Sequence, residues 1–155
     1  MQETGETATL SAPGEHDAVT VDFAHSSSVV QSVAQLGRPS VGHATAAGKV
    51  MHAFGDVELP SDPLTSFTPR TIATRAELIA ELERVRRRGY AEAREEREAD
   101  LAAVAAPVFD SRRDLVGIVG VQGPASRFDR RSMQAAMPLL LGHTAALSGE
   151  LGLQV

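Results

Sequence analysis

Residues 101–122 read LAAVAAPVF-DSRRD-LVGIVGVQ, and this stretch decides the fold. Two runs rich in small apolar and β-branched residues, Leu101–Phe109 and Leu115–Gln122, flank five polar residues, Asp110–Asp114. Runs of this length and composition are typical of buried strands, and a short polar connection joins antiparallel neighbours. The stretch therefore predicts a β-hairpin and, with it, an antiparallel sheet.

Alternating or β-branched runs outside this hairpin, separated by Gly, Pro and Ser, predict four more strands. They cover Thr7–Leu10, Ala18–Phe23, Val29–Ala34 and Tyr90–Arg94. Because sequence neighbours are mostly joined by short turns, we expect about six antiparallel strands and not a parallel βαβ arrangement.

Three helices complete the predicted order β-β-β-α-α-β-β-β-α. Apolar residues at helical spacing predict the first helix over His43–Phe54. Thr74 and Glu77 form a capping box that begins the second helix, and Gly89 ends it. Asp129 caps the third helix. The predicted fold class is α+β, with the helices packed on the sheet.

The composition limits the function. A length of 155 residues fits a single domain over 1–155. Cys is absent, which excludes a disulfide scaffold and a thiol nucleophile. The net charge of −5 argues against a chain that grips nucleic acid by itself. No long apolar run predicts a membrane segment, so we expect a cytoplasmic protein. With few aromatic residues, the core consists of small aliphatic side chains that leave room for cavities.

No sequence motif for catalysis withstands inspection. Gly42–Lys49 resembles a phosphate-binding loop, but five residues separate its glycines and Val50 follows the lysine. The motif needs four residues there and a Ser or Thr after the lysine. No nucleophile elbow occurs, and the histidines lack partners at metal-binding spacing. We therefore expect no enzyme activity, no metal and no cofactor.

Two charged runs remain. Arg84, Arg86, Arg87 and Arg88 crowd the end of the second predicted helix. We interpret them as a solvated helix end, with a phosphate-binding cluster as the alternative. The run Glu92–Glu98 alternates in sign, and we expect it to decorate an exposed strand edge.

A set of six short phrases, in a fixed order, spans almost the whole chain. They are Glu3–Thr7, His43–Lys49, Leu64–Ile72, Arg88–Tyr90, Ala105–Val108 and Gly123–Arg127. Together they resemble the effector-binding domain of the IclR family of bacterial transcription regulators. The resemblance implies a curved sheet of the GAF-like or profilin-like kind, with a small organic effector between the concave sheet and the first helix.

The resemblance also implies partners. Family members carry a winged helix-turn-helix before the strand that starts here, so we expect DNA binding only through that domain, which this chain lacks. We expect the intact regulator to be a homodimer or homotetramer, and its effector to be a small molecule.

The effector-binding positions implied by the resemblance depart from those of the family. Where relatives hold small acids with an Asp, a Cys and two Ser, this chain has Ala93, Ala103, Gly120 and Gln122. The amides at Ala46 and Ala47 open the first helix and suit a carboxylate, although small residues there also suit close helix–sheet packing. The expected pocket walls are Val29, Ser32, Ser40 and Leu101.

The loss of the polar clamp changes the ligand that we expect. A tiny acid depends on charge-assisted hydrogen bonds, each worth about 1.5–3 kcal/mol. A wider, more apolar pocket favours a larger ligand than pyruvate or glyoxylate, for example an aromatic molecule, with Gln122 orienting it. The alternative is a dimerisation module whose pocket is filled by neighbouring side chains.

Overall fold

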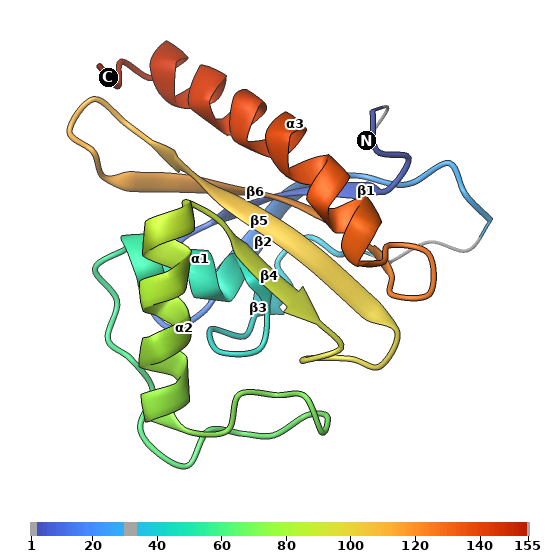
Figure 1. Ribbon diagram of the computed structural model, residues 1–155. Helices are drawn as coiled ribbons and strands as arrows, with labels where there is room; N and C mark the ends of the chain where they lie inside the picture. The colour runs from blue at the N-terminus through green and yellow to red at the C-terminus, as the bar shows by residue number, and fades with distance from the viewer. Residues whose placement is uncertain (1–2, 30–33, 155) are drawn as a thin grey trace.

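A single curled sheet of six antiparallel strands organises the computed structural model, which describes residues 3–29 and 34–154 (Figure 1). The strand order is β3-β2-β1-β6-β5-β4. The strands are β1 (Thr7–Ala12), β2 (Ala18–Ala24), β3 (Pro39–Ser40), β4 (Ala91–Arg94), β5 (Leu101–Phe109) and β6 (Leu115–Pro124). The predicted hairpin is β5 and β6, and it lies inside the sheet because β4 and β1 pair with its outer edges.

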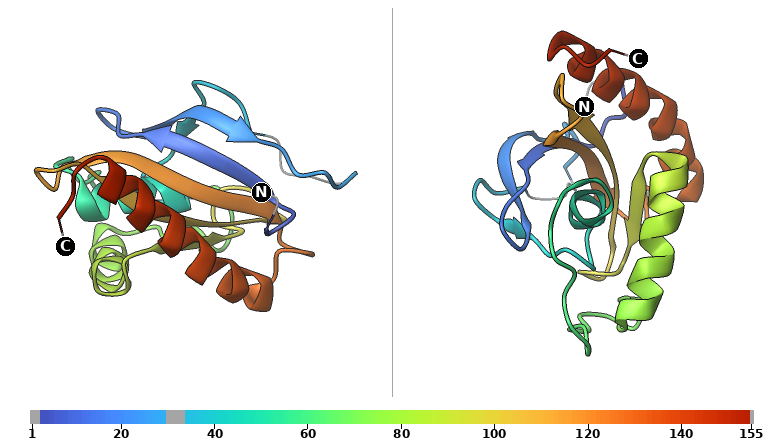
Figure 2. Two further views of the ribbon diagram at one scale, coloured as in Figure 1. Left: turned by 90° about the horizontal axis from the view of Figure 1, so that it is seen from above. Right: turned by 90° about the vertical axis from the view of Figure 1, so that its left-hand side faces the viewer.

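Helices cover both faces of the sheet. α1 (Ala46–Phe54) lies within its curl with α2 (Arg75–Arg88) beside it, and α3 (Arg130–Glu150) crosses the opposite face (Figure 2). Within the described residues, no helix combines the length and the hydropathy needed to cross a bilayer. The predicted α+β class and element order are confirmed.

Alternation along β5 divides the core into two parts. Ala102, Val104 and Ala106 are buried against α3, in a cluster with Phe128 and Met133. The residues between them face α1 and α2, where Ala105 packs in a second cluster that includes Val50, Met51 and Leu82. This is the period of two expected of a strand covered on both faces.

The structure corrects the predicted third strand. The run Val29–Ala34 falls largely on residues outside the described ranges, and its two described ends, Val29 and Ala34, are not in a strand. The strand that pairs with β2 is Pro39–Ser40, with Ala18 opposite Ser40. A strand of only two residues is too short for a sequence pattern to indicate it.

The first helix begins three residues later than predicted. Thr45, in an extended conformation, is the N-cap, and its hydroxyl accepts a hydrogen bond from the Gly48 amide at 3.0 Å. His43 instead lies before the helix, where its Nε2 is 2.7 Å from the Thr65 carbonyl oxygen. The predicted capping of α2 by Thr74 and its end at Gly89 are confirmed, because Gly89 has φ +82° and its amide donates to Val85.

Glycine at position 48 sets how closely α1 approaches the preceding loop. A Cβ added to Gly48 would lie 2.5 Å from both the Gly42 Cα and the Val41 carbonyl oxygen. These are backbone atoms, so no side-chain rotation relieves the overlap. The first turn of α1 therefore keeps its position against the sheet only because position 48 carries no side chain.

We predict that Gly48→Ala destabilises the fold by about 1–3 kcal/mol, although alanine favours helices. The matched control is Gly142→Ala in α3, where a Cβ would meet nothing within 4 Å. That control should stabilise by about 0.5–1 kcal/mol. Urea unfolding measures both; a Gly48→Ala chain as stable as Gly142→Ala would contradict the close-approach argument.

Candidate functional site

A cavity of about 380 Å³ opens between the start of α1 and the concave face of the sheet. Its walls come from α1, from all six strands, and from the segments that precede β3 and α1 and join β4 to β5. Its lining combines eight alanines and Gly120 with threonine and charged side chains. Close-packed interiors have few such voids, and a space of this size is in the range of ligand sites.

Most residues that the sequence singled out line this cavity. Ala46 and Ala47 come from α1, and the others come from the sheet: Ser40, Ala93, Leu101, Ala103, Gly120 and Gln122. Two do not belong to the group. Val29 is fully exposed and does not line the cavity, and Ser32 lies outside the described residues.

Strand register explains why residues far apart in sequence meet here. Ala93 on β4 pairs with Ala103 on β5, and Ala103 pairs with Gln122 on β6. Gly120 lies two residues from Gln122 on the same face, and a Cβ at Gly120 would come 2.8 Å from the Thr9 hydroxyl oxygen. One floor is thus built from three adjacent strands, and short side chains keep it open.

Two backbone amides at the start of α1 lie at this cavity without a hydrogen-bond acceptor among the described residues. The Gly48 amide is bonded to the Thr45 hydroxyl, whereas the described residues provide no partner for the amides of Ala46 and Ala47. The first turn of α1 also carries no acidic residue. Backbone amides at a helix start attract negative charge, so this end of the cavity suits a carboxylate.

Charged side chains that the sequence analysis missed form the rim. Arg38, which precedes β3, is ion-paired with Glu98 on the β4–β5 connection, and each side chain is 42% exposed. The Arg97 guanidinium lies over the ring of Phe67, 4.1 Å from its centroid. Arg38, Glu98 and Arg97 all line the cavity. The Arg38–Glu98 pair spans 60 residues, so no local pattern could have indicated it.

The predicted exposed edge at Glu92–Glu98 is wrong for Glu96. The Lys49 side chain is 2% exposed and the Glu96 side chain 13%, and the lysine Nζ lies 2.8 Å from Glu96 Oε1. Nζ also donates to the Glu92 carbonyl oxygen at 2.8 Å. The cause of the error is the chain reversal after β4, which turns Glu96 inward to the only lysine of the sequence.

Lys49 connects three elements through its charge. It belongs to α1, Glu96 follows β4, and Glu81 of α2 lies 3.7 Å from Nζ. A buried ammonium of this kind is tolerated because its hydrogen bonds and carboxylate partners replace water. The network holds α1, and with it the cavity wall, against α2 and the β4–β5 connection.

The histidines, all of them within the described residues, lie apart from the cavity floor. In the parts of the chain that the structure describes, no three His, Asp or Glu side chains are grouped so as to hold a metal ion. His52 is buried in α1, and this burial lowers its pKa and favours the neutral ring. His143 pairs with Glu3 at 2.6 Å on the surface, far along the chain from the cavity lining.

We predict that Lys49→Met destabilises the protein by about 3–5 kcal/mol, because Glu96 would be left buried without its cation. Adding Glu96→Gln to Lys49→Met should recover part of this loss, since the uncompensated charge is then removed. Urea denaturation of the wild type, the single variant and the double variant measures both effects. A Lys49→Met chain within 1 kcal/mol of the wild type, on the order of a surface pair, would contradict the assigned network.

Comparison with known proteins identifies the family of this chain. The family model for the bacterial transcriptional regulator IclR C-terminal domain matches residues 1–148. The chain is 32% identical to the HTH-type transcriptional regulator KdgR of Dickeya chrysanthemi over 96% of its length, and 28% identical to the HTH-type transcriptional repressor AllR of Escherichia coli strain K12 over 99%. It spans 50% and 59% of those two relatives. They are transcriptional regulators and not enzymes.

Solved structures agree in shape. The crystal structure of the Thermotoga maritima IclR protein matches 98% of this chain and 64% of that one, with a TM-score of 0.87 and 30% identity. The C-terminal domain of the E. coli regulator KdgR matches 97% of this chain and 90% of that one, with a TM-score of 0.81 and 28% identity. The chain therefore belongs to the IclR C-terminal domain family of bacterial transcriptional regulators.

Proposed function

We propose that this chain is the effector-sensing domain of an IclR-type transcription regulator, and that its effector is larger and more apolar than pyruvate or glyoxylate. The observation that carries the proposal is the open cavity between α1 and the sheet, with its floor of small neutral residues. A filled pocket would have favoured the alternative, a module that only joins subunits.

The floor of the cavity favours a ligand that buries apolar surface over a small acid that depends on polar side chains. Ala93, Ala103 and Gly120 cannot donate side-chain hydrogen bonds, so a two- or three-carbon acid on this floor gains none from these positions. The lining arginines lie at the rim, where Arg38 pairs with Glu98 and Arg97 lies over Phe67. An aromatic ring that buries about 150 Å² of apolar surface gains about 4 kcal/mol. The amides of Ala46 and Ala47 would receive its carboxylate, and Gln122 on the floor would orient its ring substituent.

A solved structure of similar fold contains an aromatic acid. The inducer-binding domain of the Acinetobacter transcription factor PobR, as a double mutant, was solved in complex with 3-hydroxybenzoic acid; it has a TM-score of 0.82 to this chain and 23% identity. The similarity concerns the fold alone. An aromatic acid for this chain rests on the lining of its own cavity.

In the intact regulator, the sensing domain would act on a winged helix-turn-helix domain in a cytoplasmic homodimer or homotetramer. The coupling between effector and DNA binding is typically worth about 1–3 kcal/mol. The whole of residues 1–155 would form the single sensing domain in that assembly.

A thermal-shift panel of benzoate, phenylacetate, pyruvate and glyoxylate tests the ligand class. We predict that an aromatic acid raises the Tm of this chain, because a ligand at 100 times its Kd stabilises by about 2.7 kcal/mol. Pyruvate and glyoxylate at the same concentration should leave the Tm unchanged. Isothermal titration calorimetry then gives the affinity of the acid that stabilises most.

Ala103→Leu should weaken this binding more than tenfold by filling the floor, and Ala80→Leu on the exposed face of α2 is the matched control. If pyruvate stabilises as much as the aromatic acids, the size argument fails. If no acid in the panel stabilises the wild type, the subunit-joining alternative replaces the sensing role.

A further inference from the structure

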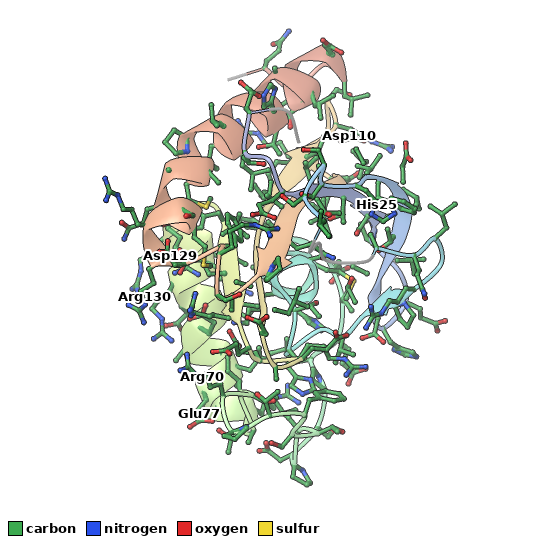
Figure 3. All side chains as sticks on the ribbon, turned by 90° about the vertical axis from the view of Figure 1, so that its right-hand side faces the viewer. His25, Arg70, Glu77, Asp110, Asp129 and Arg130 are labelled. Carbon is green, nitrogen blue, oxygen red and sulfur yellow. The ribbon has the colours of Figure 1, made fainter. Side chains whose placement is uncertain are left out.

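A second cavity of about 430 Å³ lies on the other side of the Lys49–Glu96 pair, between α2, β4 and the first turn of α3. Six of its lining residues are cationic: Lys49, Arg70, Arg84, Arg88, Arg94 and Arg130. Figure 3 shows Arg70 and Arg130 on the same flank of the molecule, beside α2 and the N-terminal end of α3. The arginines that sequence analysis treated as a solvated helix end thus belong in part to a built concave surface.

The charges of this cavity do not balance. Against the six cations stand three lining carboxylates, Glu81, Glu92 and Glu96. Glu95, which pairs with Arg70 at 3.4 Å, adds one carboxylate beside it. Asp129, the N-cap of α3 next to Arg130, adds a fifth carboxylate, which interacts with Arg94. One positive charge therefore remains, in a chain whose overall net charge is −5. Such a local excess of positive charge attracts an anion.

The pairing pattern leaves donors available for that anion. Glu81 is shared by Arg84 at 2.9 Å and Arg88 at 3.1 Å, so one carboxylate serves two guanidinium groups. Arg130 has no hydrogen bond or ion pair to any other residue that the structure describes, and it is exposed at the start of α3. Its charge at a helix N-terminus is unfavourable for the helix dipole, so a bound anion would offset that cost.

Arg94 is held in position from the opposite wall. Its guanidinium donates to the carbonyl oxygens of Ala125 at 3.2 Å and Phe128 at 3.3 Å, which fixes it between β4 and the loop before α3. The cavity therefore combines anchored and free guanidinium groups from α2, β4 and α3. Guanidinium forks match phosphate oxygens in geometry as well as charge.

We propose that this cavity is a second ligand site, separate from the effector cavity, and that it binds the phosphate group of a small phosphomonoester. A phosphomonoester carries about −1.5 to −2 charges at pH 7 on one group with three acceptor oxygens, and these oxygens suit the convergence of several arginines. The volume leaves room for the organic part of a small metabolite. The proposal does not depend on the identity of the effector.

Isothermal titration calorimetry of the full 155-residue chain at constant ionic strength tests the site with glycerol 3-phosphate, inorganic phosphate and succinate as probes. Glycerol 3-phosphate should bind saturably, inorganic phosphate more weakly, and succinate not measurably. Arg84→Gln and Arg130→Gln should each weaken glycerol 3-phosphate about tenfold, as expected for one lost charge-assisted hydrogen bond. Both side chains are exposed, so neither change threatens folding.

Arg131→Gln is the matched control, because Arg131 is exposed, adjacent in sequence and absent from the cavity lining. It should leave the affinity for glycerol 3-phosphate within twofold. The proposal is overturned if glycerol 3-phosphate does not bind, if succinate binds equally well, or if Arg131→Gln weakens binding as much as Arg130→Gln. Ala103→Leu should retain phosphate binding, which separates this test from that of the effector cavity.

Discussion

The close approach of the Val41–Gly42 backbone to Gly48 is the constraint on which the site depends. It lets α1 begin deep within the curl of the sheet, with the amides of Ala46 and Ala47 turned to the floor made by β4, β5 and β6. A larger residue at position 48 would move the helix start, and a larger residue at Ala93 or Ala103 would fill the space that the helix start faces. Small residues on both sides therefore leave an open chamber between α1 and the sheet.

Lys49, the next residue of α1, gives this arrangement a fixed electrostatic anchor. Its ammonium group is enclosed by the Glu92 carbonyl, Glu96 and Glu81, which come from β4, the β4–β5 connection and α2. Glu96 lines both cavities, so one buried ion pair forms the wall between a chamber of small neutral residues and a concave surface rich in arginine.

Predictions from the sequence were correct where residues close together in the chain determine the element. The hairpin at 101–122, the capped helix from Thr74 to Gly89 and the antiparallel α+β class follow from residue type and spacing, and each was confirmed. The family resemblance brought in the residues of the cavity floor, which strand register places together.

The features that escaped prediction depend on contacts between distant segments. The Arg38–Glu98 rim pair joins residues 60 apart, and the inward turn of Glu96 depends on a lysine 47 residues earlier. The third strand was misplaced because two residues, Pro39 and Ser40, were enough to pair with the edge of β2. A local sequence pattern does not indicate these pairings, because the partner of each residue is determined by which segments lie side by side after folding.

The most direct test of the central claim is a crystal structure of this chain grown with the aromatic carboxylate that stabilises it most. We expect the ring between Ala47 and Ala103, with the carboxylate within hydrogen-bonding distance of the Ala46 and Ala47 amides. A structure in which protein side chains fill that space, with the acid elsewhere or absent, would contradict the account.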